Sequence, residues 1–139
     1  MKYLEHIGIA VKDLEASQEL FDRLLNTKPY KTEEVPLEQV RTVFYRSGES
    51  KIELLEATGP ESAIARHIEK RGEGIHHIAF EVKDIHKEME RLKEEGFRII
   101  NEKPKKGADN KWVAFLHPKS SNGVLIELCQ EIKAERSEE

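Results

Sequence analysis

The chain has 139 residues, of which 37% are hydrophobic and 36% are charged, and its formal net charge is −4. This length predicts one packed domain, the negative charge argues against general nucleic-acid binding, and no apolar run reaches the roughly 18 residues of a membrane helix. A single cysteine excludes an internal disulfide and a multi-cysteine zinc site. No signal-peptide-like apolar stretch follows Met1, so we expect a cytoplasmic protein with no membrane partner.

One part of the sequence occurs twice. Residues 6–14 (HIGIAVKDL) and 77–85 (HIAFEVKDI) are identical at five of nine positions. Shorter segments follow each copy, in the same order and at nearly equal spacing, and these are 52–55 (IELL) and 126–129 (IELC). Two matches in the same order indicate a duplicated module rather than a chance similarity.

The first module is predicted over about residues 3–57, with the element order βαβββ. A helix follows the first strand and begins after Asp13, which is a favourable N-cap residue. One apolar stripe of this helix is expected to contain Leu14, Leu20, Phe21, Leu24 and Leu25. The predicted strands span about 3–11, 28–34, 39–46 and 51–56.

A bridging helix at about 62–72, capped by Ser62, leads into a second βαβββ module at about 74–130. Its helix begins after Asp84, and residues 131–139 are expected to form a charged tail. The strands of this module are predicted at about 75–82, 97–101, 111–117 and 123–129. The fold class is therefore α+β, with two tandem modules forming a single domain over residues 1–130.

Side chains alternate between the two faces of a strand, which sorts the residues around each histidine. His6 shares its face with Gly8, and His77 shares its face with Ala79, while larger apolar residues occupy the opposite faces. A sheet face that carries small side chains leaves room for a ligand. These two histidines are therefore expected to face an open cleft instead of the core.

The last strand of each module contributes a carboxylate to the same kind of face. Glu53 alternates with apolar neighbours in the first module, and Glu127 does so in the second. If the modules pair about a pseudo-twofold axis, these carboxylates converge with His6 and His77. Two imidazoles and two carboxylates suit a divalent cation such as Co²⁺, Mn²⁺, Ni²⁺ or Zn²⁺, and they do not distinguish among these ions.

Three further residues have structural interpretations beside functional ones. His76 is expected to face away from His77 and to pack or form a hydrogen bond there. His117 precedes a proline near a turn, where a structural role and a role in substrate binding stay open. Cys129 shares the face of Glu127 and could line the cleft, but it has no obvious activating partner and is not interpreted as a nucleophile.

Taken together, these segments resemble the vicinal oxygen chelate, or glyoxalase-like, superfamily and, within it, the methylmalonyl-CoA epimerase family. The resemblance covers nearly the whole chain from His6 to Glu131. The segments that carry it include 6–11 (HIGIAV), 72–80 (GEGIHHIAF), 104–108 (PKKGA), 117–119 (HPK) and 123–128 (GVLIEL). It implies a U-shaped metal-binding cleft, with Co²⁺ as the expected ion, a homodimer, and interconversion of the (R) and (S) forms of methylmalonyl-CoA through an enolate.

The resemblance also raises a question about the catalytic residues. Glu127 matches a metal ligand and candidate base of the family. Many bacterial members carry glutamate at the position of Thr42 and glutamine at the position of Glu53. This chain therefore lacks the carboxylate at position 42 and has one at position 53 instead. We expect Glu53 to act as the second base while it contacts the metal. The alternative is that Glu53 is only a ligand and that water or another residue serves the other face of the substrate.

The segment 103–119 contains five lysines and one acidic residue, in contrast to the acidic chain as a whole. If the substrate is an acyl-CoA, Lys105, Lys106 and Lys119 are candidates to bind its phosphates. The alternative is that these lysines are solvated loop charges.

Two other functions remain open at this point. A glyoxalase I-type lactoylglutathione lyase would use the same four ligands on a hemithioacetal. A metal-free binding member of the superfamily would sequester a ligand in the cleft, although four intact ligands argue against it.

Overall fold

A computed structural model describes residues 1–133 of the chain, and most of the predicted tail at 131–139 lies outside the described residues. The described elements are β1 (Tyr3–Ala10), α1 (Leu14–Leu25), β2 (Lys31–Val35), the 3-10 turn η1 (Pro36–Glu38), β3 (Val40–Ser47), β4 (Ser50–Ala57), α2 (Ala63–Arg71), β5 (Gly74–Glu81), α3 (Ile85–Glu94), β6 (Lys105–Gly107), β7 (Lys111–Leu116), the 3-10 turn η2 (Pro118–Ser121) and β8 (Ile126–Glu131). None of these helices is long and apolar enough to cross a membrane.

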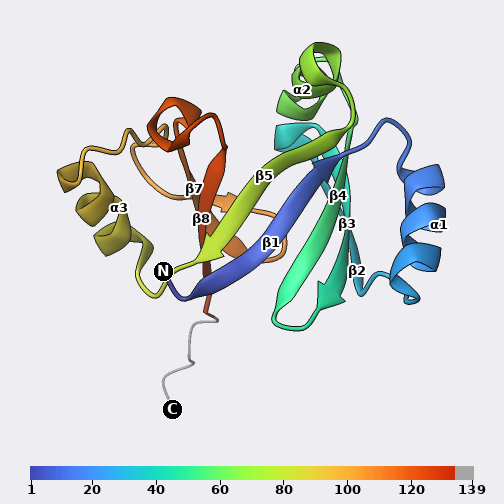
Figure 1. The fold of residues 1–139 in the computed structure, drawn as a ribbon, viewed down its shortest axis with the longest axis horizontal. Helices are drawn as coiled ribbons and strands as arrows, with labels where there is room; N and C mark the ends of the chain where they lie inside the picture. The colour runs from blue at the N-terminus through green and yellow to red at the C-terminus, as the bar shows by residue number, and fades with distance from the viewer. Residues whose placement is uncertain (134–139) are drawn as a thin grey trace.

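All eight strands form one sheet, in the order β2-β3-β4-β1-β5-β8-β7-β6. Each module contributes four adjacent strands, and the first strand of each module pairs in parallel with its last strand. The modules join through the antiparallel pair β1 and β5, which run side by side through the centre of Figure 1. This arrangement confirms the predicted α+β fold of two tandem βαβββ modules.

The helices begin where the sequence predicts. The side chain of Asp13 accepts a hydrogen bond from the amide of Ala16 at the start of α1, and Asp84 accepts one from Lys87 at the start of α3. Ser62 caps α2 in the same way. In Figure 1, α1 and α3 lie at opposite ends of the molecule and α2 lies between them.

Each module has its own apolar core beneath its helix. Leu14 packs with Leu54 and Tyr45 under α1, and a second cluster lies under α3. The prediction for two α1 leucines is wrong, because Leu20 is 54% exposed and Leu24 is 70% exposed. With about 100° of rotation per residue, both positions lie roughly a quarter-turn or more away from the line through Leu14. The buried stripe is therefore narrower than predicted.

Three predicted strand ranges need correction. The segment 97–101 makes only an isolated bridge, from Ile99 to Leu116, because Lys105–Gly107 takes the edge position along the first half of β7. β2 begins at Lys31 instead of 28, after Pro29, which has no amide hydrogen to donate. β8 begins at 126 instead of 123, because the preceding turn places two residues at positive φ.

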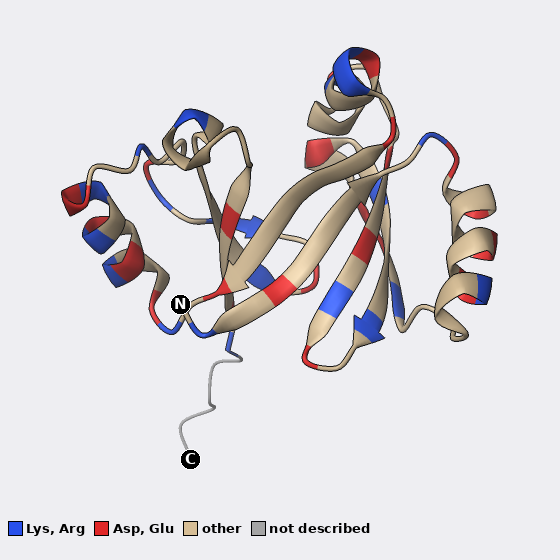
Figure 2. Ribbon diagram, in the orientation of Figure 1, with Lys and Arg blue, Asp and Glu red and all other residues tan. Residues whose placement is uncertain are grey.

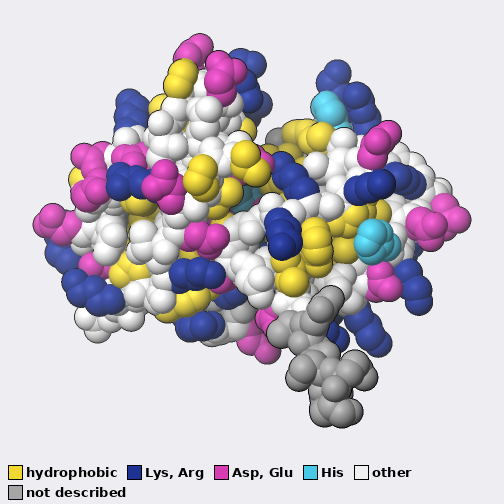
Figure 3. Space-filling view, turned by 180° about the vertical axis from the view of Figure 1, so that it is seen from behind, with side chains coloured by type: hydrophobic (Ala, Val, Ile, Leu, Met, Phe, Trp, Pro, Cys, Tyr) yellow, Lys and Arg dark blue, Asp and Glu magenta, His cyan; other side chains and the backbone are white. Residues whose placement is uncertain are grey.

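The surface carries charges of both signs. Figure 3 shows the face opposite to that of Figure 1, where lysine and arginine side chains alternate with acidic ones around patches of hydrophobic side chains. Most of the buried charged residues, by contrast, line one pocket, among them Glu5, Glu53, Lys111 and Glu127.

Candidate metal centre

Two rows of residues cross the centre of the sheet and position the site. In one row Gly8 of β1 is the pairing partner of both Glu53 on β4 and His77 on β5. In the other row Ala79 of β5 is the partner of both His6 on β1 and Glu127 on β8. Each small residue therefore separates a histidine from a glutamate and leaves space above itself. The predicted alternation of small and functional side chains is confirmed for both modules.

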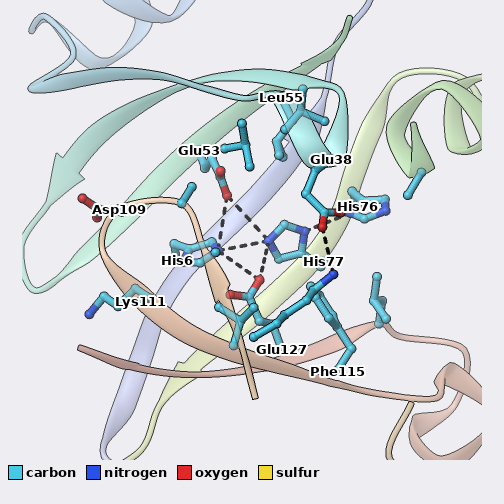
Figure 4. Close-up of a pocket in the computed structure, with 18 of the residues that line it drawn as sticks. His6, Glu38, Glu53, Leu55, His76, His77, Asp109, Lys111, Phe115 and Glu127 are labelled. Carbon is cyan, nitrogen blue, oxygen red and sulfur yellow. Dashed lines mark hydrogen bonds and ion pairs between the residues drawn. The ribbon is translucent and has the colours of Figure 1, made fainter. Parts of the chain in front are cut away.

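The four side chains converge on one point, as Figure 4 shows. The two Nε2 atoms of His6 and His77 lie 3.0 Å apart. Oε1 of Glu53 lies 3.3 Å from Nε2 of His6 and 3.7 Å from Nε2 of His77. Oε1 of Glu127 lies 3.6 Å and 3.1 Å from the same two atoms. The two carboxylates flank the histidine pair from opposite sides.

The geometry of three of these side chains fits the coordination shell of one divalent cation, because the ligand atoms of His6, His77 and Glu127 all lie within 4.8 Å of one another. Glu53 is not part of that group, but it approaches the same two histidine nitrogens. Atoms bonded to an ion at about 2.1 Å lie about 3.0 Å apart at right angles and about 3.4 Å apart at tetrahedral angles. The His–His and His–Glu distances given above span 3.0 to 3.7 Å. All four side chains are buried, so their charges need compensation in place. These residues could hold a cation with nitrogen and oxygen ligands.

Three of these side chains, His6, Glu53 and Glu127, have shifted pKa values. Burial would lower the pKa of His6, but the facing carboxylates, Glu127 foremost, raise it well above its usual value. Burial raises the pKa of Glu53, against the opposing effect of the two histidines. Burial also acts to raise the pKa of Glu127, but His6 and His77 outweigh it and hold that pKa well below its usual range. The two carboxylates therefore differ electrostatically although they occupy equivalent positions in the repeat.

Thr42 contacts one of the carboxylates directly. Its hydroxyl donates a hydrogen bond of 2.9 Å to Oε2 of Glu53, and both residues are buried. This contact fixes the oxygen that does not face His6 and leaves Oε1 toward the centre. Residue 42, where the family resemblance predicts glutamate in many bacterial members, is threonine in this chain. It supports Glu53 by a hydrogen bond.

A pocket of about 310 Å³ surrounds the four side chains. Lys105 and Lys106 line it, and Lys105 forms a 3.0 Å ion pair with Glu38 of the other module. Lys119 is not among the described residues that line the pocket; it lies on η2, where its amide donates to the ring of His117. The ring of His117 thus caps the start of η2.

Two residues beside the histidines make contacts that the sequence does not predict. The prediction that His76 faces away from His77 is wrong, because its Nδ1 lies 2.9 Å from Nδ1 of His77 and it lines the pocket. Glu5 carries no recognisable signal in the sequence, yet its Oε1 lies 2.6 Å from Nδ1 of His6. Burial lowers the pKa of His76 to about 3, with a further contribution from His77. Cys129 is fully buried beside Glu81 and does not line the pocket.

Comparisons of this chain with known proteins agree on one family. The sequence pattern of the Glyoxalase/Bleomycin resistance protein/Dioxygenase superfamily matches residues 5–115. An ethylmalonyl-CoA/methylmalonyl-CoA epimerase of Cereibacter sphaeroides is 43% identical over 129 residues, which are 91% of this chain and 96% of the relative.

Two solved structures are also similar. A methylmalonyl-CoA epimerase from Mycobacterium tuberculosis superposes with a TM-score of 0.90 at 32% identity and covers 94% of this chain and 89% of its own. A Streptomyces coelicolor methylmalonyl-CoA epimerase in complex with 2-nitronate-propionyl-CoA has a TM-score of 0.89 at 32% identity, over 96% and 99% of the two chains.

The close approach at Gly8 generates a test of the site's packing. A Cβ at this position would collide with the His77 ring, so Gly8→Ala is expected to lower the free energy of unfolding by about 1–3 kcal/mol and to displace that ring. Gly59→Ala is the control, because the atoms nearest to its Cβ belong to the flexible side chain of Gln39, with the terminal Oε1 first. Chemical denaturation of both variants measures the difference, and equal stabilities would contradict the packing described here.

Proposed function

We propose that this chain, which belongs to the Glyoxalase/Bleomycin resistance protein/Dioxygenase superfamily, is an epimerase that interconverts (R)- and (S)-methylmalonyl-CoA. The observation that carries the proposal is the pair of buried carboxylates, Glu53 and Glu127, on opposite sides of two histidines that line one pocket. Relatives named as epimerases of this substrate, with similarity over most of the chain, support it. A homodimer and a cytoplasmic location remain predictions from the sequence.

The substrate contains an acidic carbon. Its α-carbon lies between a thioester carbonyl and a carboxylate, so removal of the α-proton gives an enolate whose charge spreads onto oxygen. We propose that His6, His77, Glu53 and Glu127 hold a divalent cation, with Co²⁺ preferred over Mn²⁺, Ni²⁺ and Zn²⁺. When bound, such an ion would attract the developing negative charge on the substrate oxygens and make the α-proton easier to remove.

Inversion at the α-carbon requires proton transfer on both of its faces. One group must remove the proton from one face, and a second group must return a proton to the other face. Glu127 and Glu53 approach the histidine pair from opposite sides, which supports this division of roles. Thr42 holds Glu53 in place through Oε2, so the remaining oxygen faces the pocket.

Exchange of the α-proton tests the proposed reaction. In deuterated buffer the protein is expected to incorporate deuterium at the α-carbon of methylmalonyl-CoA while it inverts that carbon, and a chelator is expected to abolish both. An assay with methylglyoxal and glutathione is the control for lyase activity. Absence of exchange from metal-loaded protein would contradict the proposal, and exchange that persists after chelation would contradict the metal assignment.

The role of Glu53 as a base is tested by Glu53→Gln, which keeps an oxygen that can contact the cation. Loss of a general base is expected to lower the epimerisation rate by about 10²–10⁴-fold. Exchange from the one epimer whose proton faces Glu127 is expected to persist without inversion. Bound metal is measured in the same sample. Near-normal epimerisation would leave Glu53 with a ligand role only.

The size of the pocket limits how much of the substrate it can hold. About 310 Å³ is at the low end of the ~300–1,000 Å³ typical of ligand pockets, so the acyl group fits while the coenzyme phosphates must lie toward the mouth. Lys105 and Lys106 line the pocket, which supports a role in binding those phosphates. The role of Lys119 remains a prediction of the sequence.

Charge neutralisation tests these lysines. Lys105→Gln and Lys106→Gln are each expected to raise KM by about 2- to 5-fold at low salt, corresponding to up to ~1 kcal/mol for an exposed ion pair. The salt dependence of KM is expected to decrease, since fewer charged contacts remain to be screened. Lys119→Gln is measured in parallel, and Lys28→Gln is the control because Lys28 is exposed outside the pocket. Unchanged KM and salt dependence in both pocket variants would favour solvated loop charge.

A further inference from the structure

Both central strands contain a β-bulge directly before their site histidine. Along β1 and β5, Leu4 pairs with Phe80 and His6 pairs with Ala79, so Glu5 is an extra residue on β1. Farther along the same ladder, Gly8 pairs with His77 and Ile9 pairs with Ile75, so His76 is the extra residue on β5. The two bulges occupy equivalent positions in the repeat.

The bulges redirect the side chains of Glu5 and His76. In a regular strand each would point to the face opposite its neighbouring histidine. A bulge leaves one residue out of the ladder and changes the direction of its side chain. As a result, Oε1 of Glu5 lies 2.6 Å from Nδ1 of His6, and Nδ1 of His76 lies 2.9 Å from Nδ1 of His77. Both residues line the pocket.

We propose that Glu5 and His76 are a matched pair of positioning residues, one for each histidine of the proposed metal centre. Each accepts a hydrogen bond from Nδ1 of its neighbour, which fixes the ring orientation and leaves the lone pair of Nε2 directed at the shared centre. Outer partners of metal-bound histidines commonly act in this way. This inference rests on the proposed function, because it assumes a cation between the two Nε2 atoms.

The two positioning residues, Glu5 and His76, differ in charge and in the contacts that hold them in place. Glu5 is 1% exposed, and its Oε2 lies 2.6 Å from Nζ of Lys51 and 3.5 Å from Nζ of Lys111. Those lysines also bind Asp109 and Glu81, at 2.8 Å and 2.9 Å. Glu5 is therefore held at Oε1 by His6 and at Oε2 by the two lysines.

Within residues 1–133, no ion pair supports His76. Its ring packs edge-on against His67 from α2, with ring centroids 5.0 Å apart. His6 thus has an anionic partner, while His77 has an imidazole that accepts with its own Nδ1. We therefore expect cation affinity to depend more strongly on Glu5 than on His76.

Calorimetric titration of Co²⁺ into metal-free protein tests the pair without relying on activity. Glu5→Gln and His76→Leu are each expected to weaken binding, by about 10- to 100-fold for Glu5→Gln and by about 10-fold for His76→Leu. His76→Asn supplies an oxygen near the position of Nδ1 and is expected to stay within about threefold of the parent protein. Glu81→Gln is the matched control, because Glu81 is a buried carboxylate that shares Lys111 but has no contact with His6 in the described structure.

The outcomes separate this inference from the proposed function. If the parent protein binds one Co²⁺ and Glu5→Gln or His76→Leu binds it equally well, the positioning role of that residue is overturned. If Glu81→Gln loses as much affinity as Glu5→Gln, the effect belongs to the ion network and the role of Glu5 is also overturned. If the parent protein binds no cation, the proposed metal centre fails together with this inference. Thermal unfolding of every metal-free variant identifies any that fail to fold.

Discussion

The antiparallel pairing of β1 with β5 is the constraint on which the site depends. It places the first strands of the two modules side by side, so that Gly8 lies between His77 and Glu53 while Ala79 lies between His6 and Glu127. A shift of one residue in this register would send the functional side chains of one module to the opposite face of the sheet. The duplication therefore matters chemically only because the two copies pair in this register.

The centre of the sheet concentrates buried charge, which is costly unless the charges compensate one another. Figure 2 shows acidic positions in the middle of the central strands as well as at their ends. Beside the four convergent side chains, Glu5 contacts Lys51 and Lys111 away from solvent. Strongly perturbed titratable groups in a pocket are typical of functional sites, and here they surround the two histidines.

Sequence periodicity predicted the paired modules and the four convergent residues, because alternation and duplication are regular features of the chain. It did not predict the contacts of Glu5 and His76, because a β-bulge depends on the partner strand and interrupts the alternation that the prediction assumes. The helix α1 shows the same limit, since counting leucines overestimated the buried stripe and included Leu24. The Thr42–Glu53 contact likewise requires the pairing of β3 with β4, which local sequence does not specify.

An epimerase of this kind needs acid–base groups on both faces of a carbon and a stabilised negative charge between them. In the proposed function, residues from both halves of the duplicated fold would meet these needs at one point. Anomalous diffraction from crystals grown with Co²⁺ tests this account most directly. It predicts one peak within about 2.0–2.3 Å of Nε2 of His6 and His77 and of one oxygen each from Glu53 and Glu127. The absence of a peak between the two histidines would contradict it.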